Sequence, residues 1–275
     1  MGGMTQAEHY EQFLNMHQQS EAFVMPNVWD GLSALIFKHA GFAALATSSA
    51  ALAFALGRPD GRHGVSLAEH LAHATLLIEV SGLPVNGDFE DGYGATPDDV
   101  AATVRVAIDA GLAGIGVEDT SGDPANPIRD FDDAVARVRA AAQAARGRIV
   151  LTGRTDNFIQ GRDDLDDTIR RLTAFAEAGA DVLYAPYPPD MAAVEAIVKA
   201  VAPKPVNLLL GTKSEQPTVA ELSAAGVRRI SIGSRLYLHA AAAVQDAAAA
   251  LAQGDLAAVT TAMSSREVGA LLASD

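Results

Sequence analysis

The sequence predicts an α/β protein built as a (β/α)8 TIM barrel. Three observations predict this fold. Short apolar runs, typical of strands, alternate along the chain with alanine-rich amphipathic segments, typical of helices. Eight such units fit into 275 residues, which is the usual size of the fold. Polar residues recur at the carboxyl ends of the strands throughout the chain, which favours a closed barrel over a doubly wound open sheet with one switch point.

The strands and helices are expected in strict alternation. Strands are expected at residues 23–28, 44–49, 84–90, 114–119, 149–156, 182–187, 205–210 and 229–234. Helices are expected at 31–39, 66–80, 96–110, 132–145, 165–178, 191–200, 218–225 and from 236 onward. Several helices precede a glycine that can adopt the left-handed conformation closing a helix, namely Gly41, Gly111, Gly179 and Gly226.

The domain organisation is expected to be simple. No linker rich in proline, glycine or serine interrupts the pattern, so residues 1–275 are predicted to form a single barrel domain. The segment 240–275 is longer than one closing helix requires. It is expected to form a C-terminal helical extension of two helices, one of them free to pack on another subunit.

Composition excludes several classes of protein. The chain has no cysteine, which excludes disulfides, zinc–thiolate sites and a cysteine nucleophile. It has no apolar run long enough for a membrane span, and its polar, acidic N-terminus is unlike a signal peptide, so a cytoplasmic location is expected. The net charge of −14 argues against a nucleic-acid partner. It does not argue against a small anionic substrate, because a metal ion and an arginine can set the local field.

The stretch 84–94, PVNGDFEDGYG, concentrates acids at the end of the third strand. Residues two apart in a strand point to the same side, so Asp88 and Glu90 are expected to project together. Two carboxylates in one pocket repel each other unless a cation or a proton lies between them. Mg²⁺ suits such a place because it prefers oxygen ligands and keeps several waters. A solvated acidic turn is the alternative interpretation.

Other polar residues are expected at the same end of the barrel. They are Thr47, Ser48 and Ser49, then Arg58, Asp60, Arg62 and His63, then Glu118, Asp119, Arg154, Asp156, Asn207, Ser234 and Arg235. Since GIGVED is otherwise an apolar strand, one of its two acids must point at the barrel mouth. Simpler interpretations remain open: Ser48 or Ser49 caps a turn, Arg154 pairs with Asp156, and His63 is a loop residue, since no HxH or HExxH pattern is present.

Five motifs occur in order between residues 26 and 237: TSSAALAFALGRPDG, PVNGDFEDGYG, GVEDT, GRTDNF and AGADVLYAP. In combination they resemble the isocitrate lyase/phosphoenolpyruvate mutase superfamily. The resemblance implies a barrel that uses Mg²⁺, with Mn²⁺ as the alternative ion, and a homotetramer built as a dimer of dimers with a swapped helix. It also implies a small anionic 2-oxo or 2-hydroxy acid as substrate, with C–C or P–C bonds made or broken through a metal-held enolate.

The resemblance implies roles for four acids. Asp88 resembles the direct metal ligand. Asp60, Glu90 and Glu118 resemble the acids that hold the metal mostly through its waters, and Asp60 is also assigned to catalysis.

The resemblance further implies a substrate site. Ser48 and the backbone of Ser49 and Ala50 resemble the segment that grips the carboxylate and carbonyl oxygen of the substrate. Arg154 resembles the arginine that pairs with the substrate anion, and Ser48 and Arg154 are both assigned to catalysis. Asn207 stands where some lyases bind a second carboxylate.

Two departures from the superfamily pattern bear on the reaction. The loop after the fourth strand reads TSGDPANPIRDFDD and lacks the catalytic Cys of the lyases and the Lys of the mutases, keeping only Asn126. Pro186 stands where the lyases have a glutamate and the mutases a histidine. The proton donor is therefore open, with Tyr93, Tyr187 and a bound water as candidates.

The sequence thus predicts a Mg²⁺-dependent lyase-type enzyme that cleaves or forms a C–C bond next to a 2-oxo or 2-hydroxy carboxylate. The alternatives are a phosphoenolpyruvate mutase or phosphonopyruvate hydrolase, an oxaloacetate decarboxylase or hydrolase, and a non-catalytic binder of 2-oxo acids. A barrel that seats a phosphate on the SIGSRL turn is a further alternative.

Overall fold

The fold is seen in a computed structural model, which describes residues 3–61, 63–209, 216–260 and 262–273. Arg62 and Leu210, which the sequence placed in a rim loop and in a strand, lie outside the described residues, as do the outermost residues of the predicted domain. The strands are β1 Phe23–Met25, β2 Leu45–Ala46, β3 Val85–Asp88, β4 Gly114–Glu118, β5 Val150–Arg154, β6 Val182–Tyr184, β7 Val206–Leu208 and β8 Arg229–Ser231.

Helices connect the strands and flank them at both ends of the chain. They are α1 Gln6–His17, α2 Gly31–His39, α3 Ser49–Ala55, α4 Leu67–Ser81, α5 Pro97–Asp109, α6 Phe131–Ala145, α7 Leu165–Ala178, α8 Met191–Val201, α9 Val219–Ala224, α10 Arg235–Ala252, the 3-10 helix Leu256–Val259 and α11 Ser265–Ala273.

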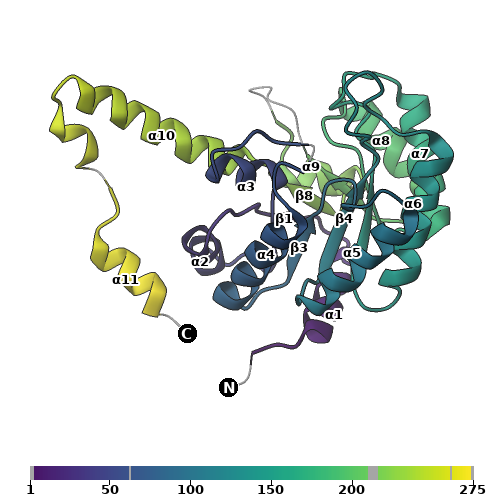
Figure 1. The fold of residues 1–275 in the computed structure, drawn as a ribbon, viewed down its shortest axis with the longest axis horizontal. Coiled ribbons are helices and arrows are strands. Elements are labelled where there is room, and N and C mark those ends of the chain that lie inside the picture. Colours follow the sequence, from purple (N-terminus) through teal and green to yellow (C-terminus); the bar gives the residue numbers. More distant parts are fainter. Residues whose placement is uncertain (1–2, 62, 210–215, 261, 274–275) are drawn as a thin grey trace.

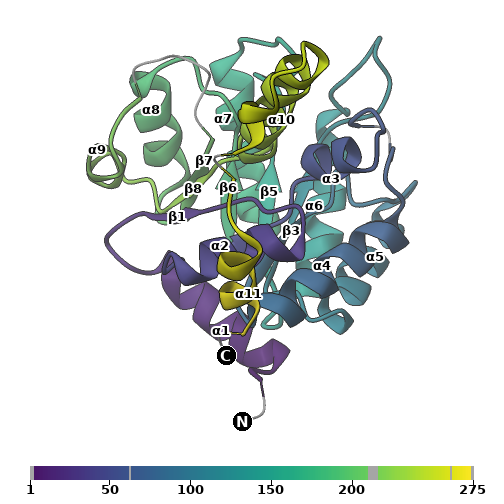
Figure 2. The same cartoon turned by 90° about the vertical axis from the view of Figure 1, so that its left-hand side faces the viewer.

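The strands form one parallel sheet in the order β1-β8-β7-β6-β5-β4-β3-β2. A parallel bridge between Asn27 and Ala46 joins the two end strands, so the sheet closes into a nearly complete barrel (Figures 1 and 2). The predicted (β/α)8 barrel is therefore confirmed.

Local sequence explains where the helices begin and end. The hydroxyl of Ser66 caps α4 by accepting from the backbone N–H of Glu69, whose carboxylate accepts from Ser66 in return. Gly179, predicted to close a helix, is the C-cap of α7 with a φ of 113°. Gly41, Gly111 and Gly226 also have positive φ. These local signals therefore place the helix ends correctly.

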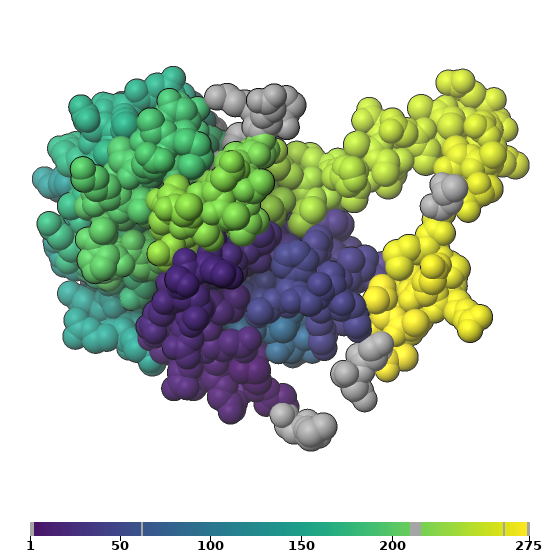
Figure 3. Space-filling model, turned by 180° about the vertical axis from the view of Figure 1, so that it is seen from behind, coloured from purple at the N-terminus to yellow at the C-terminus, as the bar shows by residue number. Residues whose placement is uncertain are grey.

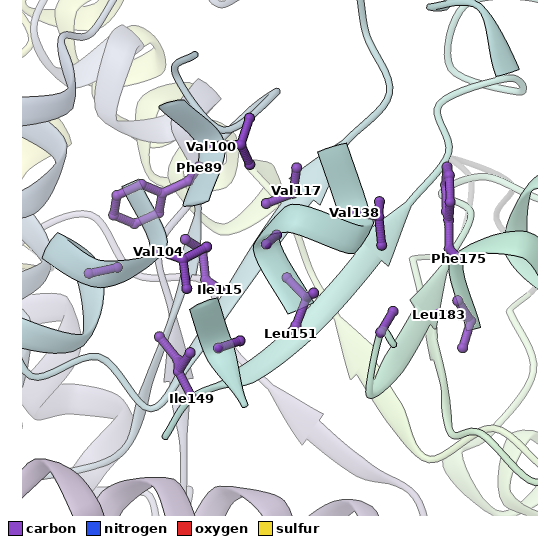
Figure 4. Close-up of a cluster of buried hydrophobic side chains, with 14 of the residues drawn as sticks. Phe89, Val100, Val104, Ile115, Val117, Val138, Ile149, Leu151, Phe175 and Leu183 are labelled. Carbon is purple, nitrogen blue, oxygen red and sulfur yellow. The ribbon is translucent and has the colours of Figure 1, made fainter. Parts of the chain in front are cut away.

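The core lies between the strands and the helices that cover them. Figure 4 shows Phe89, Ile115, Leu151, Phe175 and Leu183 in one buried cluster, and none of the five side chains is exposed. Burial of side chains of this size contributes roughly 1.5–3 kcal/mol each. The cluster makes the barrel wall a rigid support for the rim loops.

Two helices were not predicted. α1 covers the amino end of the barrel, where Gln6 donates to the carbonyls of Leu112 and Arg148, and α3 begins directly after β2 with Ser48 as its N-cap. The sequence missed α1 because its sparse apolar positions, Phe13 above all, stand among polar residues. The strands are also shorter than predicted, because residues at their carboxyl ends leave the sheet to form the rim.

The C-terminal segment leaves the barrel. None of the 18 residues of α10 is buried, and Figure 3 shows α10 and the 3-10 helix extending from the body, while α11 returns beside α2. Several apolar side chains on it are exposed, including Val244 at 69% and Leu256 at 73%. Among the helices of the described residues, none has the length and apolar character needed to cross a membrane.

Acid is expected to destabilise the protein through His17, which is buried at the amino end of the barrel. Its Nε2 accepts from Arg229 and its Nδ1 donates to the carbonyl of Phe13, so the ring is neutral. Burial, with Arg229 second, lowers the pKa of His17 to about 3. Between pH 6.5, where an unfolded histidine titrates, and pH 3 the unfolded chain binds the extra proton, so stability falls as pH falls.

The slope from this one group approaches about 1.4 kcal/mol per pH unit. Urea unfolding of the wild type and of His17→Gln between pH 7 and 4 measures it. The wild type should lose stability more steeply than the variant, and parallel curves would contradict the assignment.

Candidate active site

Two cavities open where the strands end. The acid cavity, about 320 Å³, is lined by Glu90, Glu118 and Asp156 together with loop residues from Thr120 to Pro127. The inner cavity, about 160 Å³, reaches into the barrel. Residues that line it include Ser48, Ala50, Asn86, Asp88, Tyr184, Tyr187, Asn207 and Arg229. Ser49, Asp60, Arg154 and Ile159 line both cavities, so the two are adjacent parts of one site.

Asp88 stands at the end of β3, where three elements hold it. Its Oδ2 accepts from the backbone N–H and the hydroxyl of Ser49, both at 3.0 Å. Its backbone N–H donates to Thr47 Oγ1 at 2.8 Å, and its Oδ1 lies 3.2 Å from Arg154 Nη1. The carboxylate is therefore fixed in orientation in the inner cavity, and two of the residues that hold it, Ser49 and Arg154, line both cavities.

Glu90 reaches the site by a different route from the one predicted. The strand ends at Asp88, and Glu90 lies in the following turn with a φ of 47°, so the prediction that alternation along a strand aligns the two acids is wrong. Such a φ is uncommon for a residue with a side chain. Glu90 Oε1 accepts from Tyr93 Oη at 3.2 Å and Oε2 accepts from the backbone of His63 at 3.1 Å. The turn, not the strand, aims it into the acid cavity.

Three carboxylates share the guanidinium of Arg154. Asp156 accepts from Nε and Nη2 at 2.5 and 2.8 Å, while Nη1 lies 3.2 Å from Asp88 and 3.1 Å from Glu118. One positive charge therefore faces three negative charges. Arg154 is placed at the site as predicted, but its fork is filled by Asp156, which is the structural ion pair that the sequence left open.

Burial, with repulsion between the acids as a further cause, raises the pKa values of three carboxyls at the rim. Burial, followed by repulsion from Asp156 and Asp88 and opposed by Arg154, raises the pKa of Glu118 well above its usual range. Burial and then Asp88 raise the pKa of Asp60, although its side chain is exposed at the cavity mouth, and burial raises that of Glu90. These carboxyls need either protons or a cation to lie so close together.

A divalent cation fits this set of oxygen donors. Among the described residues no three acids converge into a ready-made cage. The donors at the rim are carboxylate oxygens, the kind that Mg²⁺ prefers, and Mg²⁺ takes one or two carboxylates directly and keeps waters toward the rest. Asp88, Glu118, Glu90 and Asp60 are the residues that would hold it.

The other acid of the fourth strand has a structural place. Asp119 is buried and accepts from Thr155 Oγ1 at 2.8 Å and from the backbone of Asp156 at 3.0 Å, with Arg171 at 3.3 Å. Of the pair at the strand end, Glu118 faces the cavity, and Asp119 supports the loop that carries Asp156.

The segment predicted to grip a substrate carboxylate is at the cavity wall, and several of its polar groups are engaged within the protein. Ser48 Oγ accepts from the backbone of Ala51 at 3.2 Å as the cap of α3, and the backbone N–H of Ser49 donates to Asp88. Ser48, Ser49 and Ala50 all line the inner cavity. Their proximity to the site agrees with the prediction, while their substrate contacts stay predictions.

Asn207 is also engaged. Its Oδ1 accepts from Arg229 Nε at 2.9 Å and its Nδ2 donates to Ser231 Oγ at 2.6 Å. Arg229 also donates to Thr152 Oγ1 at 2.9 Å and contacts His17. Sequence reasoning missed Arg229 because arginine at the start of a strand ordinarily faces solvent. A buried guanidinium at the cavity floor nevertheless favours an anionic ligand.

Of the two tyrosines that are candidate proton donors, only Tyr187 lines a cavity. Tyr93 Oη is directed at Val65, His70 and Glu90, and Tyr93 does not line either cavity. Tyr187 lines the inner cavity and has a φ of 58°.

The loop after β4 lies over the acid cavity. Thr120 pairs with Ile128, and Asn126 is exposed and bonds to Asp123 within the loop. Thr120, Asp123, Pro124 and Pro127 line the acid cavity, whereas Asn126 does not. The only mutase-like residue of this loop is thus not among the residues that line the acid cavity.

The phosphate-binding alternative depends on the SIGSRL turn, and part of this turn is hydrogen-bonded within the protein. The backbone N–H groups of Ile232 and Gly233, just before α10, both donate to Asn27 Oδ1, at 2.9 and 2.8 Å. Two of the backbone N–H groups in this turn are therefore already used within the protein.

Comparison with known proteins identifies relatives by sequence and by structure. A family model described as phosphoenolpyruvate phosphomutase matches residues 13–252. A candidate lyase/mutase from Burkholderia cenocepacia J2315 superposes with a TM-score of 0.93 at 40% identity, covering 98% of this chain and 97% of that one.

Two better described structures are also similar. Oxaloacetate acetylhydrolase in complex with its product oxalate gives a TM-score of 0.86 at 28% identity, covering 98% of this chain and 95% of that one. The lyase of 2,3-dimethylmalate, a member of the PEP mutase/isocitrate lyase superfamily, gives 0.84 at 25% identity with coverage of 98% and 95%.

Proposed function

The chain belongs to the phosphoenolpyruvate phosphomutase family of the isocitrate lyase/PEP mutase superfamily, and from this premise we propose that it cleaves or forms a C–C bond next to a 2-oxo or 2-hydroxy carboxylate. The observation that carries the proposal is the sharing of Arg154 by Asp88, Glu118 and Asp156 at the barrel rim. This excess of negative charge is suited to a divalent cation, which we propose to be Mg²⁺ or Mn²⁺.

A bound divalent cation would supply Lewis-acid stabilisation of negative charge on the substrate's oxygens. The residues of the chain do the rest. Ser49 holds Asp88 in place through two hydrogen bonds. Arg154 lines both cavities, where its positive charge would attract an anionic group of the substrate. Tyr187, strained and lining the inner cavity, is the proposed proton donor.

The names of similar proteins favour a C–C bond over a P–C bond. The names of oxaloacetate acetylhydrolase and 2,3-dimethylmalate lyase indicate that both act on small dicarboxylic acids. The mutase alternative draws on the family model, but the one mutase-like loop residue, Asn126, is turned to Asp123. The cavity floor with Arg229 and Asn207 suits a second carboxylate.

We also propose that the protein assembles as a homotetramer in which the arm of α10 and α11 packs on a neighbouring subunit. The 18-residue helix α10 has no buried residue and exposes Val244, and the 3-10 helix after it exposes Leu256, which supports this proposal. The barrel and this extension, residues 1–275, are proposed to make one domain. Sedimentation velocity of the full chain tests the assembly, and a monomer at micromolar concentration would contradict it.

The reaction is tested with purified protein, first stripped with EDTA and then supplied with Mg²⁺. Oxaloacetate, 2-methylmalate-type hydroxy diacids and phosphonopyruvate are offered, and oxalate, pyruvate, glyoxylate and phosphate are measured. Release of a carbon fragment from a diacid only with Mg²⁺ is expected. Phosphate from phosphonopyruvate would select the mutase or hydrolase alternative, and full turnover in the stripped protein would contradict the metal. Binding of a 2-oxo acid without turnover would identify a non-catalytic binder.

A further inference from the structure

Three side chains connect the backbone of Asp88 to the carboxylate of Glu90. Asp88 N–H donates to Thr47 Oγ1 at 2.8 Å, and Thr47 Oγ1 lies 3.1 Å from His70 Nε2. His70 Nδ1 lies 3.2 Å from Tyr93 Oη, which donates to Glu90 Oε1 at 3.2 Å. Thr47 follows β2, His70 is on α4, and Tyr93 is in the turn after β3. A continuous chain of hydrogen bonds therefore joins the two acids from behind.

The chain has one direction in which every proton finds an acceptor. Thr47 Oγ1 already accepts from Asp88, so its own hydrogen can go to His70 Nε2. The imidazole then carries its hydrogen on Nδ1 and donates it to Tyr93 Oη, which leaves the phenol hydrogen for the two acceptors beyond it, Glu90 Oε1 at 3.2 Å and the carbonyl of Val65 at 3.1 Å. The opposite tautomer would take the Tyr93 hydrogen away from the carboxylate and leave Thr47 without an acceptor.

The setting of His70 holds this arrangement rigidly. Its side chain is fully buried, and its ring stacks on Phe89, the residue between Asp88 and Glu90, with centroids 4.5 Å apart. Burial lowers its pKa to about 4, which keeps the ring neutral near pH 7. His73, one turn along α4, contacts only the carbonyl of Trp29 among the hydrogen bonds of the described residues. The two histidines of α4 thus differ in their hydrogen-bond partners.

We propose that His70 is a positioning residue that fixes Asp88 and Glu90 relative to each other and so sets the affinity of the rim for a divalent cation. The inference rests on the proposed function, since it assumes that these acids hold the ion. A histidine that merely filled the core would need neither the link to Thr47 nor the link to Tyr93. Partners behind metal ligands typically change metal affinity 10- to 100-fold when they are removed.

The test compares His70→Phe with His73→Phe. Phenylalanine keeps the volume and the stacking on Phe89 but removes both hydrogen bonds. Calorimetric titration with Mg²⁺ should show affinity lowered by about 10- to 100-fold in His70→Phe and unchanged in His73→Phe. Equal affinity in folded His70→Phe and wild type would overturn the proposal.

Two further measurements test the role of His70 without relying on the His70→Phe variant. In the metal-free wild type, the ¹⁵N shifts of His70 should report a neutral ring protonated on Nδ1; protonation on Nε2 would contradict the chain. If His70→Phe does not fold, Thr47→Val and Tyr93→Phe remove the chain's other members. Each should weaken Mg²⁺ binding, and the double variant should lose less than the two added together. Wild type that binds no Mg²⁺ would instead refute the proposed function.

Discussion

Replacing Asp88 with alanine is expected to lower kcat/KM about a thousand-fold or more, equivalent to about 4 kcal/mol, and to abolish calorimetric Mg²⁺ binding. Asp88 is the acid that Ser49 and Thr47 orient, and it lines the inner cavity. Without it, the rim keeps acids that would reach the ion mostly through water. Activity is measured on whichever substrate the screen identifies.

Stability separates this loss from unfolding. Asp88 is one of the carboxylates that crowd Arg154, so its removal relieves repulsion while costing its hydrogen bonds to Ser49. The thermal midpoint of the metal-free protein should therefore change by only a few degrees. Asp98→Ala removes an exposed acid in the first turn of α5 and is the matched control, expected to keep full activity. An active Asp88→Ala enzyme would refute the metal assignment.

Replacing Arg154 with methionine is expected to destabilise the metal-free protein by about 3–5 kcal/mol, the range for removing one partner of a buried ion pair. The guanidinium is 15% exposed and compensates Asp88, Glu118 and Asp156. Methionine retains bulk but leaves these carboxylates facing one another. Urea unfolding in EDTA measures the loss.

Mg²⁺ should restore more stability to Arg154→Met than it adds to the wild type, because the ion then supplies the compensating charge. Arg154→Lys is the control: it keeps the charge but loses the fork that Asp156 grips, so its loss of stability should be smaller. If the methionine variant is as stable as the wild type, or if Mg²⁺ does not stabilise it more than the wild type, Arg154 does not compensate the charge of these acids.

Much of the architecture was readable from local sequence. Helix ends such as Gly179, where an L side chain would be strained, and the alternation of strand and helix are properties of short segments. Parallel strands bring their carboxyl ends to one rim, so the presence of Asp60, Asp88, Glu118 and Arg154 at the cavities followed from the fold. The roles of these residues stay predictions until the variants are measured.

Contacts between distant segments were not readable. Arg229 meets Thr152 across 77 positions of sequence, and Asp88 meets Ser49 across 39. No local pattern indicates that the backbone N–H of Ser49 is used by an acid of another strand. The turn at Glu90, with its positive φ, likewise replaced the simple alternation that strand geometry suggested.

The sequence by itself determined that this chain closes into a barrel and gathers acids at one end, because periodicity and helix capping act over a few residues. Only the tertiary structure decided which groups those acids face. Hydrogen bonds such as that between Thr47 and His70 depend on the relative placement of β2 and α4, which is fixed only when the barrel closes and its core packs.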